Sequence, residues 1–157
     1  MTEKEETLTR LAVGFAGSCG RFAAELDAHR AAYLAERDLP EGREKAEARR
    51  RRISHGGCAF VAAQQADRQY VAFAKEAGLD GPSAAKLLQR YCDRLWERRQ
   101  AELEGAAVPA DTAGAADGGE WRPWLDVSFH PDVVRYVIGV RDYAVRWRNF
   151  LDAARTA

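Results

Sequence analysis

Apolar side chains recur at steps of three and four residues along most of this 157-residue chain, and this spacing constrains its fold most strongly. Such steps return to the same face of an α-helix, whereas a half-buried strand alternates at every second residue. No alternating segment is long enough for a sheet. The sequence therefore predicts an all-α protein, and its length favours one domain with one core.

The first helix is predicted over residues 2–37. Thr2 and Glu5 have the spacing of a capping box, and the glutamates around them place negative charge where the helix dipole is positive. Pro40 and Gly42 then end the helix and turn the chain. The inward face is predicted to comprise Leu8, Leu11, Phe15, Cys19, Phe22, Leu26, His29 and Tyr33.

A second helix is predicted over residues 43–77 and a third over 82–104, because the apolar spacing continues through both stretches. Gly78 is suited to the position just after the second helix, where a left-handed backbone conformation is common. A short turn between these helices makes them antiparallel neighbours. The inward face of the second helix is predicted to carry Ile53, Gly57, Phe60, Gln64, Val71 and Ala74.

Residues 105–120 contain Val108 as their one large apolar residue, so they cannot bury enough surface to offset their ordering entropy. We expect a flexible linker there. Pro131 then opens a fourth helix, over 131–155, at a position where its missing N–H does no harm. Together these elements predict an up-down four-helix bundle with a long flexible connection before the last helix.

The 24 basic and 24 acidic residues cancel, so no overall field draws the protein toward nucleic acid or an anionic membrane. The acidic N-terminus does not resemble a signal peptide and no apolar run is long enough to span a membrane, which predicts a cytoplasmic protein without a membrane partner. Phosphate-binding loops, zinc-protease helices and Glu-x-x-His di-metal pairs are all missing from the sequence. We therefore expect no cofactor and no metal site, and we favour a non-enzymatic role.

The fourth helix carries two apolar strips, and this doubling suggests a binding surface. One strip is expected to face the core: Val133, Val137, Val140, Ala144, Trp147 and Leu151. The second strip comprises Val134, Ile138 and Val145, bordered by Arg141 and Arg148. Our leading hypothesis is an interaction or assembly subunit that binds a protein partner, or a second copy of itself, through this second strip.

An alternative hypothesis rests on the four consecutive arginines Arg49, Arg50, Arg51 and Arg52, which could contact an RNA or DNA backbone, with Trp121 and Arg122 stacking nearby. Such a small helical subunit of a ribonucleoprotein resembles the small helical subunits of CRISPR effector complexes at the level of fold only. The structural alternative is a salt-bridged helix end, with Glu44 and Glu47 as partners for the arginines.

A third hypothesis places a small-ligand or redox site near Cys19 and Cys58, with His55 beside it. Both cysteines lie about twenty residues from the turn at Pro40, which puts them at similar heights on the two helices. Glycines cluster at the same level, and each costs about 1 kcal/mol of helix stability relative to alanine. They allow either a close helix crossing or a pocket. The glycines are Gly14, Gly17, Gly20, Gly56 and Gly57.

Overall fold

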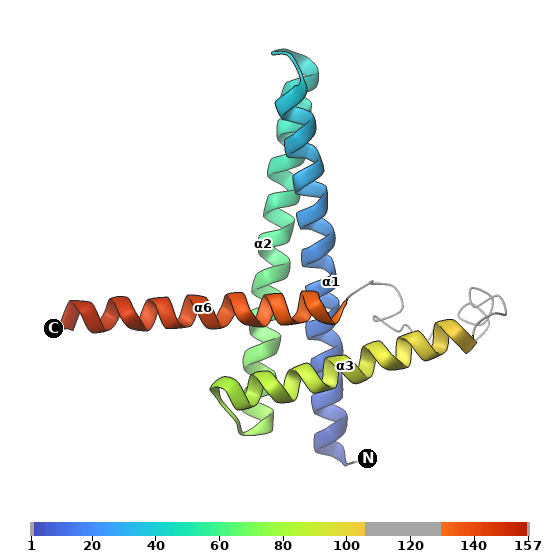
Figure 1. Ribbon diagram of the computed structural model, residues 1–157, viewed down its shortest axis with the longest axis vertical. Coiled ribbons are helices and arrows are strands. Elements are labelled where there is room, and N and C mark those ends of the chain that lie inside the picture. Colours follow the sequence, from blue (N-terminus) through green and yellow to red (C-terminus); the bar gives the residue numbers. More distant parts are fainter. Residues whose placement is uncertain (1, 106–129, 157) are drawn as a thin grey trace.

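A computed structural model describes residues 2–105 and 130–156, which form four α-helices (Figure 1). They are α1 (Glu3–Asp38), α2 (Arg43–Ala77), α3 (Gly81–Gly105) and α6 (Pro131–Thr156). No strand occurs within these two ranges, so the all-α class is confirmed. Each predicted helix end lies within one residue of the observed end. From residue 106 onward, the expected linker lies outside the described residues.

The helix ends form for the reasons that the sequence indicated. The backbone N–H of Glu5 donates to Thr2 Oγ1 at 3.2 Å, and the N–H of Thr2 donates to Glu5 Oε2 at 3.0 Å, which completes the capping box. Gly78 ends α2 in the left-handed conformation, with φ of 68°. A residue with a Cβ would be strained there.

Figure 1 shows α1 and α2 as a long antiparallel hairpin, with α3 and α6 lying across one half of it. The expected up-down arrangement of four helices is therefore not confirmed. We call residues 3–22 and 63–77, over which α3 and α6 pack, the crossed half. Residues 23–38 and 43–62, which reach the turn between the two helices, are the open half.

The hydrophobic core lies in the crossed half. Phe15 of α1, Phe73 of α2, Leu88 of α3 and Val134 of α6 are almost completely buried there, one from each helix. Burying such side chains stabilises a fold by roughly 1.5–3 kcal/mol each. In the open half the buried apolar residues of α2 are the alanines Ala48, Ala59 and Ala62. There α1 and α2 meet through small side chains, and the start of α6 approaches the edge of this half near Ala23 and Leu26.

The face of α2 that was predicted to point inward points outward instead. Ile53 is 61% exposed, Phe60 is 64% exposed and Val71 is 49% exposed. The helix meets α1 through a different stripe, formed by Ala48, Ala59, Ala62, Ala66, Tyr70 and Phe73. Alanine allows two helices to approach closely along their whole length, and here it outweighs the larger residues in deciding which face is buried.

Candidate functional site

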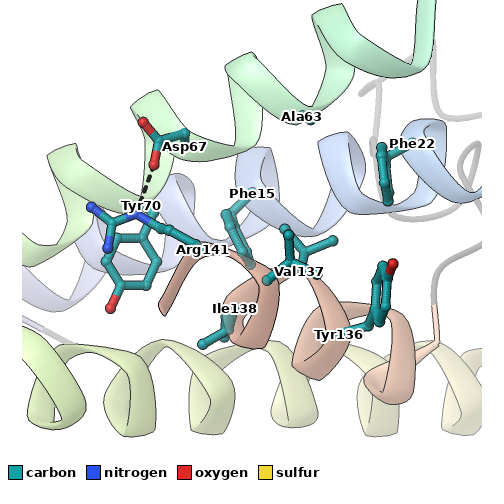
Figure 2. A pocket seen from close by; sticks show the side chains of 10 residues that line it. Phe15, Phe22, Ala63, Asp67, Tyr70, Tyr136, Val137, Ile138 and Arg141 are labelled. Atoms are coloured by element: carbon teal, nitrogen blue, oxygen red, sulfur yellow. Dashed lines mark hydrogen bonds and ion pairs between the residues drawn. The ribbon is translucent and has the colours of Figure 1, made fainter. Parts of the chain in front are cut away.

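A cleft of about 350 Å³ lies between α6 and the hairpin (Figure 2). Phe15 and Phe22 of α1, Tyr70 of α2 and Tyr136 of α6 bring aromatic rings to its walls. Figure 2 shows Arg141 reaching from α6 toward Asp67 of α2 at the rim of this cleft. The walls are mostly apolar, so the cleft offers few polar groups to orient a small ligand.

Arg141 of α6 contacts two side chains of α2. Its Nε donates to Asp67 Oδ1 at 2.6 Å, and its guanidinium lies 4.0 Å from the centre of the Tyr70 ring. A cation over an aromatic face is attracted by the ring quadrupole. The sequence hypothesis assigned Arg141 to a partner surface, and the structure instead gives it two intramolecular partners.

Tyr70 lies beneath the Arg141 guanidinium and is itself buried. The side chain is 3% exposed, and its hydroxyl donates to the carbonyl oxygen of Gly81 at 3.4 Å. Burial raises the pKa of Tyr70, and the nearby Asp142 carboxylate raises it further. The phenol therefore stays protonated at neutral pH and serves as a donor, not as a base.

Val134 and Ile138 lie in the core, which corrects their expected place on the surface. Val134 is fully buried and Ile138 is 8% exposed, and both belong to the cluster formed with the other three helices. The other strip of α6 is the more open one, since Val140 is 49% exposed. The sequence analysis expected the longer strip to face the core, whereas the structure buries Val134 and Ile138 and only partly buries Val133 and Val137 beside them. The side chains of Val145 and Arg148 lie outside the described set.

The two cysteines proposed as a redox pair have opposite environments. Cys19 is fully buried, and burial raises the pKa of its thiol to about 12. Cys58 is exposed, and neither cysteine is in a disulfide. The neighbour of Cys19 is Cys92 of α3, whose pKa burial also raises well above its usual value. A thiol of such a high pKa is a poor nucleophile, so this geometry does not favour redox chemistry.

His55 is used to join the two helices of the hairpin. Its Nδ1 lies 2.7 Å from Glu25 Oε2 on α1. His29 of α1 also joins the two helices, since its Nδ1 lies 2.9 Å from the carbonyl oxygen of Arg52 on α2. The His29 ring lies against Gly56, where an added Cβ would be 3.2 Å from the ring nitrogen. Among the glycines that the sequence singled out, a Cβ added at Gly14 or Gly56 would lie close to a neighbouring side chain, whereas one added at Gly57 would meet no described atom within 4 Å.

The arginine run is largely neutralised within the chain. Arg49 and Arg52 both donate to the carboxylate of Glu36, at 2.9 and 2.5 Å. Glu36 is 8% exposed, and these two hydrogen bonds, that of Arg52 first, lower its pKa. Arg51 pairs with Glu47, as the structural alternative predicted, at 3.4 Å. That alternative missed Glu36 because this residue is on the other helix. Trp121 and Arg122 lie outside the described residues.

The part of the chain that the structure describes contains no group of three or more side chains placed to hold a metal ion. None of its helices is long and apolar enough to cross a membrane. Comparisons with known protein families, curated proteins and solved structures find no match to this chain. The candidate surfaces therefore rest on the geometry of the chain itself.

Proposed function

We propose that the protein is a non-enzymatic assembly subunit that binds a protein partner, or a second copy of itself, through the C-terminal part of α6. The observation that carries this proposal is the reach of α6 beyond the rest of the fold. In Figure 1 the end of α6 that carries the C-terminus runs past α2, with no other helix beside it. Residues 151–155 are all exposed.

The contacts of α6 with the core all come from its first turns. Val133, Val134, Val137 and Ile138 pack on the other helices, and Arg141 binds Asp67 of α2. A helix in water gains most of its stability from packing one face against another element. Beyond these turns, residues 151–155 of α6 are exposed and lie outside the described core. A helix of the partner would supply such packing.

The sequence of α6 supplies a seam for such a helix. Its predicted core strip has the alternating four-and-three spacing of a heptad repeat, which is the pattern that pairs helices. This strip begins with the half-buried Val133 and Val137 and continues to Val140 and Leu151, which are 49% and 37% exposed. We therefore place the partner surface of α6 on this strip and near the C-terminus, in place of the strip that contains Val134 and Ile138.

Sedimentation equilibrium of the whole chain, with and without Leu151→Glu, tests the self-association form of the proposal. We expect a concentration-dependent dimer that the substitution turns into a monomer, because a buried charge in a helix seam lacks a partner. Leu34→Glu is the matched control, since Leu34 is exposed to a similar degree, 38%, on α1. A strict monomer for the unaltered chain removes self-association.

The heterologous form is tested by purification from native cells followed by mass spectrometry. A true partner is retained by the unaltered chain and by the Leu34→Glu variant, and is lost with Leu151→Glu. A partner retained equally by all three chains contradicts the assignment to α6. The arginine-run alternative has less support, because three of its four arginines have carboxylate partners within the chain.

A further inference from the structure

The side of α2 that points away from α1 carries apolar and cationic residues together. At 100° per residue, the stripe that meets α1 leaves the opposite side of the helix free. We call this side the outer face of α2. Its central members are Arg50, Ile53, Gly57, Phe60, Arg68 and Val71, all of them exposed or partly exposed in the structure.

Three large apolar side chains form a row on the outer face. Ile53, Phe60 and Val71 are 61%, 64% and 49% exposed and fall within about 20° of one another around the helix. Val61, 51% exposed, adds to them at the far edge of the face. Side chains of this size and exposure present on the order of 400 Å² together, spread over about 27 Å of the helix.

Gly57 lies between Ile53 and Phe60, and no contact with another described residue calls for a glycine there. A Cβ added at Gly57 would meet no atom of the described residues within 4 Å, so packing among these helices does not require a glycine there. Glycine in a helix interior lowers helix stability relative to alanine. A close approach by a helix from outside would account for a position without a side chain.

A row of four cations runs along the same face. Arg43, Arg50, Arg68 and Lys75 are exposed, lie within about 40° of one another around the helix and span about 48 Å. None of the four has an ion pair with another described residue. The carboxylates of α2 lie on its other sides, where Glu47 pairs with Arg51 and Asp67 pairs with Arg141. Among the described residues, the four cations of the outer face therefore have no carboxylate paired with them.

We propose that the outer face of α2 binds an acidic amphipathic helix of a partner protein. Its apolar residues would pack between Ile53 and Phe60, over Gly57, and its carboxylates would pair with Arg50 and Arg68. Helices bind to such surfaces through anchors at steps of three and four, and flanking charges select the partner. Ile53 and Val71 have no aromatic face on which a base could stack, so a nucleic-acid strand fits the row less well.

The occupant is not the open end of α6 from a second copy. That segment, residues 142–155, carries Arg146, Arg148 and Arg155 against two aspartates, Asp142 and Asp152, so its net charge is positive. Two cationic helices side by side repel each other. The outer face of α2 is thus a surface separate from the one proposed for α6, and substitutions on α2 test it independently.

The test uses the whole chain and two labelled helical peptides, each about four heptads long, with leucine at the a and d positions. One peptide has glutamate at the e and g positions, which prevents it from pairing with itself, and the other has lysine there. Fluorescence anisotropy measures the Kd of each. We expect the acidic peptide to bind at least about tenfold more tightly than the lysine peptide, with an affinity that falls as salt rises.

Two substitutions and two matched controls locate the binding. Phe60→Ser should weaken binding of the acidic peptide by about tenfold, as loss of an interface anchor does. Arg50→Gln should weaken it several-fold and flatten its salt dependence. Leu34→Ser and Arg51→Gln replace an exposed leucine and an exposed arginine elsewhere on the hairpin, and should leave the Kd unchanged. Circular dichroism confirms that each variant is folded.

Three outcomes overturn the proposal. Equal affinity for the acidic and lysine peptides removes the role of the cationic row. Equal losses in the control variants move the binding away from the outer face. Binding of a labelled single-stranded oligonucleotide that depends on Arg50, in the absence of peptide binding, replaces the acidic helix with nucleic acid. The Leu151→Glu variant should bind the acidic peptide normally, so a failure of the α6 proposal is distinguished from a failure of this one.

Discussion

The two halves of the α1–α2 hairpin are built from the same two helices but are held together differently. In the crossed half, large side chains such as Phe15 and Phe73 are buried under α3 and α6. In the open half the helices meet through alanines, and Glu25–His55 and Glu36 with its two arginines join them by directional polar contacts. The crossed half carries the stability of the fold. The open half leaves its large apolar residues Ile53 and Phe60 exposed.

The phenylalanines of α2 give the largest expected effect of this difference. Phe73→Ala removes a fully buried ring and leaves a cavity, which should lower the free energy of unfolding by about 3–5 kcal/mol. Phe60→Ala, at a ring that is 64% exposed on the same helix, should change it by less than about 0.5 kcal/mol. Urea unfolding followed by circular dichroism measures both. Similar losses would mean that the open half is covered within the chain.

The three thiols offer a chemical contrast between buried and exposed positions. Cys58 is exposed, whereas Cys19 and Cys92 are buried with raised pKa values. A thiol reagent added to the native protein should label Cys58 rapidly, and label the other two only when the fold opens. Mass spectrometry after a short labelling time should find one modified cysteine out of three. Cys58→Ser should abolish the fast phase. Rapid labelling of Cys19 would show that the crossed half opens easily.

Helix boundaries were accessible from the sequence because local chemistry sets them. Thr2 with Glu5, the glycine at 78 and the proline at 131 act within one turn of where they stand, so no knowledge of the other helices was needed. The crossing of α3 and α6 over the hairpin was not accessible. It depends on which faces meet across the whole chain.

The choice of buried face could not be predicted for α2 or for α6. On α2 the large residues Ile53 and Phe60 suggested an inward face, but alanines allow the closer approach to α1 and form that face. On α6 the longer apolar strip was expected to face inward, but the core includes Val134 and Ile138 of the shorter one. The polar contacts of Glu36 were missed for a related reason, since a hydrogen bond between helices depends on their relative register.

The glycines allow a finer comparison within the hairpin. At Gly57 an added methyl meets no atom, so Gly57→Ala should raise the free energy of unfolding by up to about 1 kcal/mol through better helix propensity. At Gly14 the methyl would lie 2.8 Å from Gln69 Nε2. Displacing Gln69 breaks the bond that the buried Ser18 hydroxyl donates to Gln69 Oε1 at 2.7 Å, a loss of about 1–3 kcal/mol.

Gly14→Ala should therefore lower the free energy of unfolding by about 1 kcal/mol once the gain in helix propensity is subtracted. Thermal unfolding of both variants alongside the unaltered protein gives the two signs directly. Stabilisation by both substitutions would mean that Gln69 moves aside freely. Destabilisation by Gly57→Ala would show that the outer face of α2 is already occupied in the free protein.

Glu36 provides the smallest and most local of the expected effects, and its sign follows from its pKa. Hydrogen bonds from Arg52 and Arg49 lower the pKa of Glu36 from its usual value of 4.5, so the folded chain favours the charged form. The stabilisation is complete above pH 4.5 and is lost as the pH falls through the lowered pKa of the folded state. Glu36→Gln removes this stabilisation at every pH.

Hydrogen exchange measures the effect of Glu36→Gln. Because Glu36 contacts its two arginines within the open half, protection should fall in residues 30–52 at neutral pH and stay unchanged around Phe15 and Phe73. Acid should reduce the protection of the open half in the unaltered protein more than in the variant. Glu44→Gln, at an exposed carboxylate of α2, controls for the loss of one negative charge. An equal acid response in the unaltered protein and in Glu36→Gln would assign the register of the open half to its alanines alone.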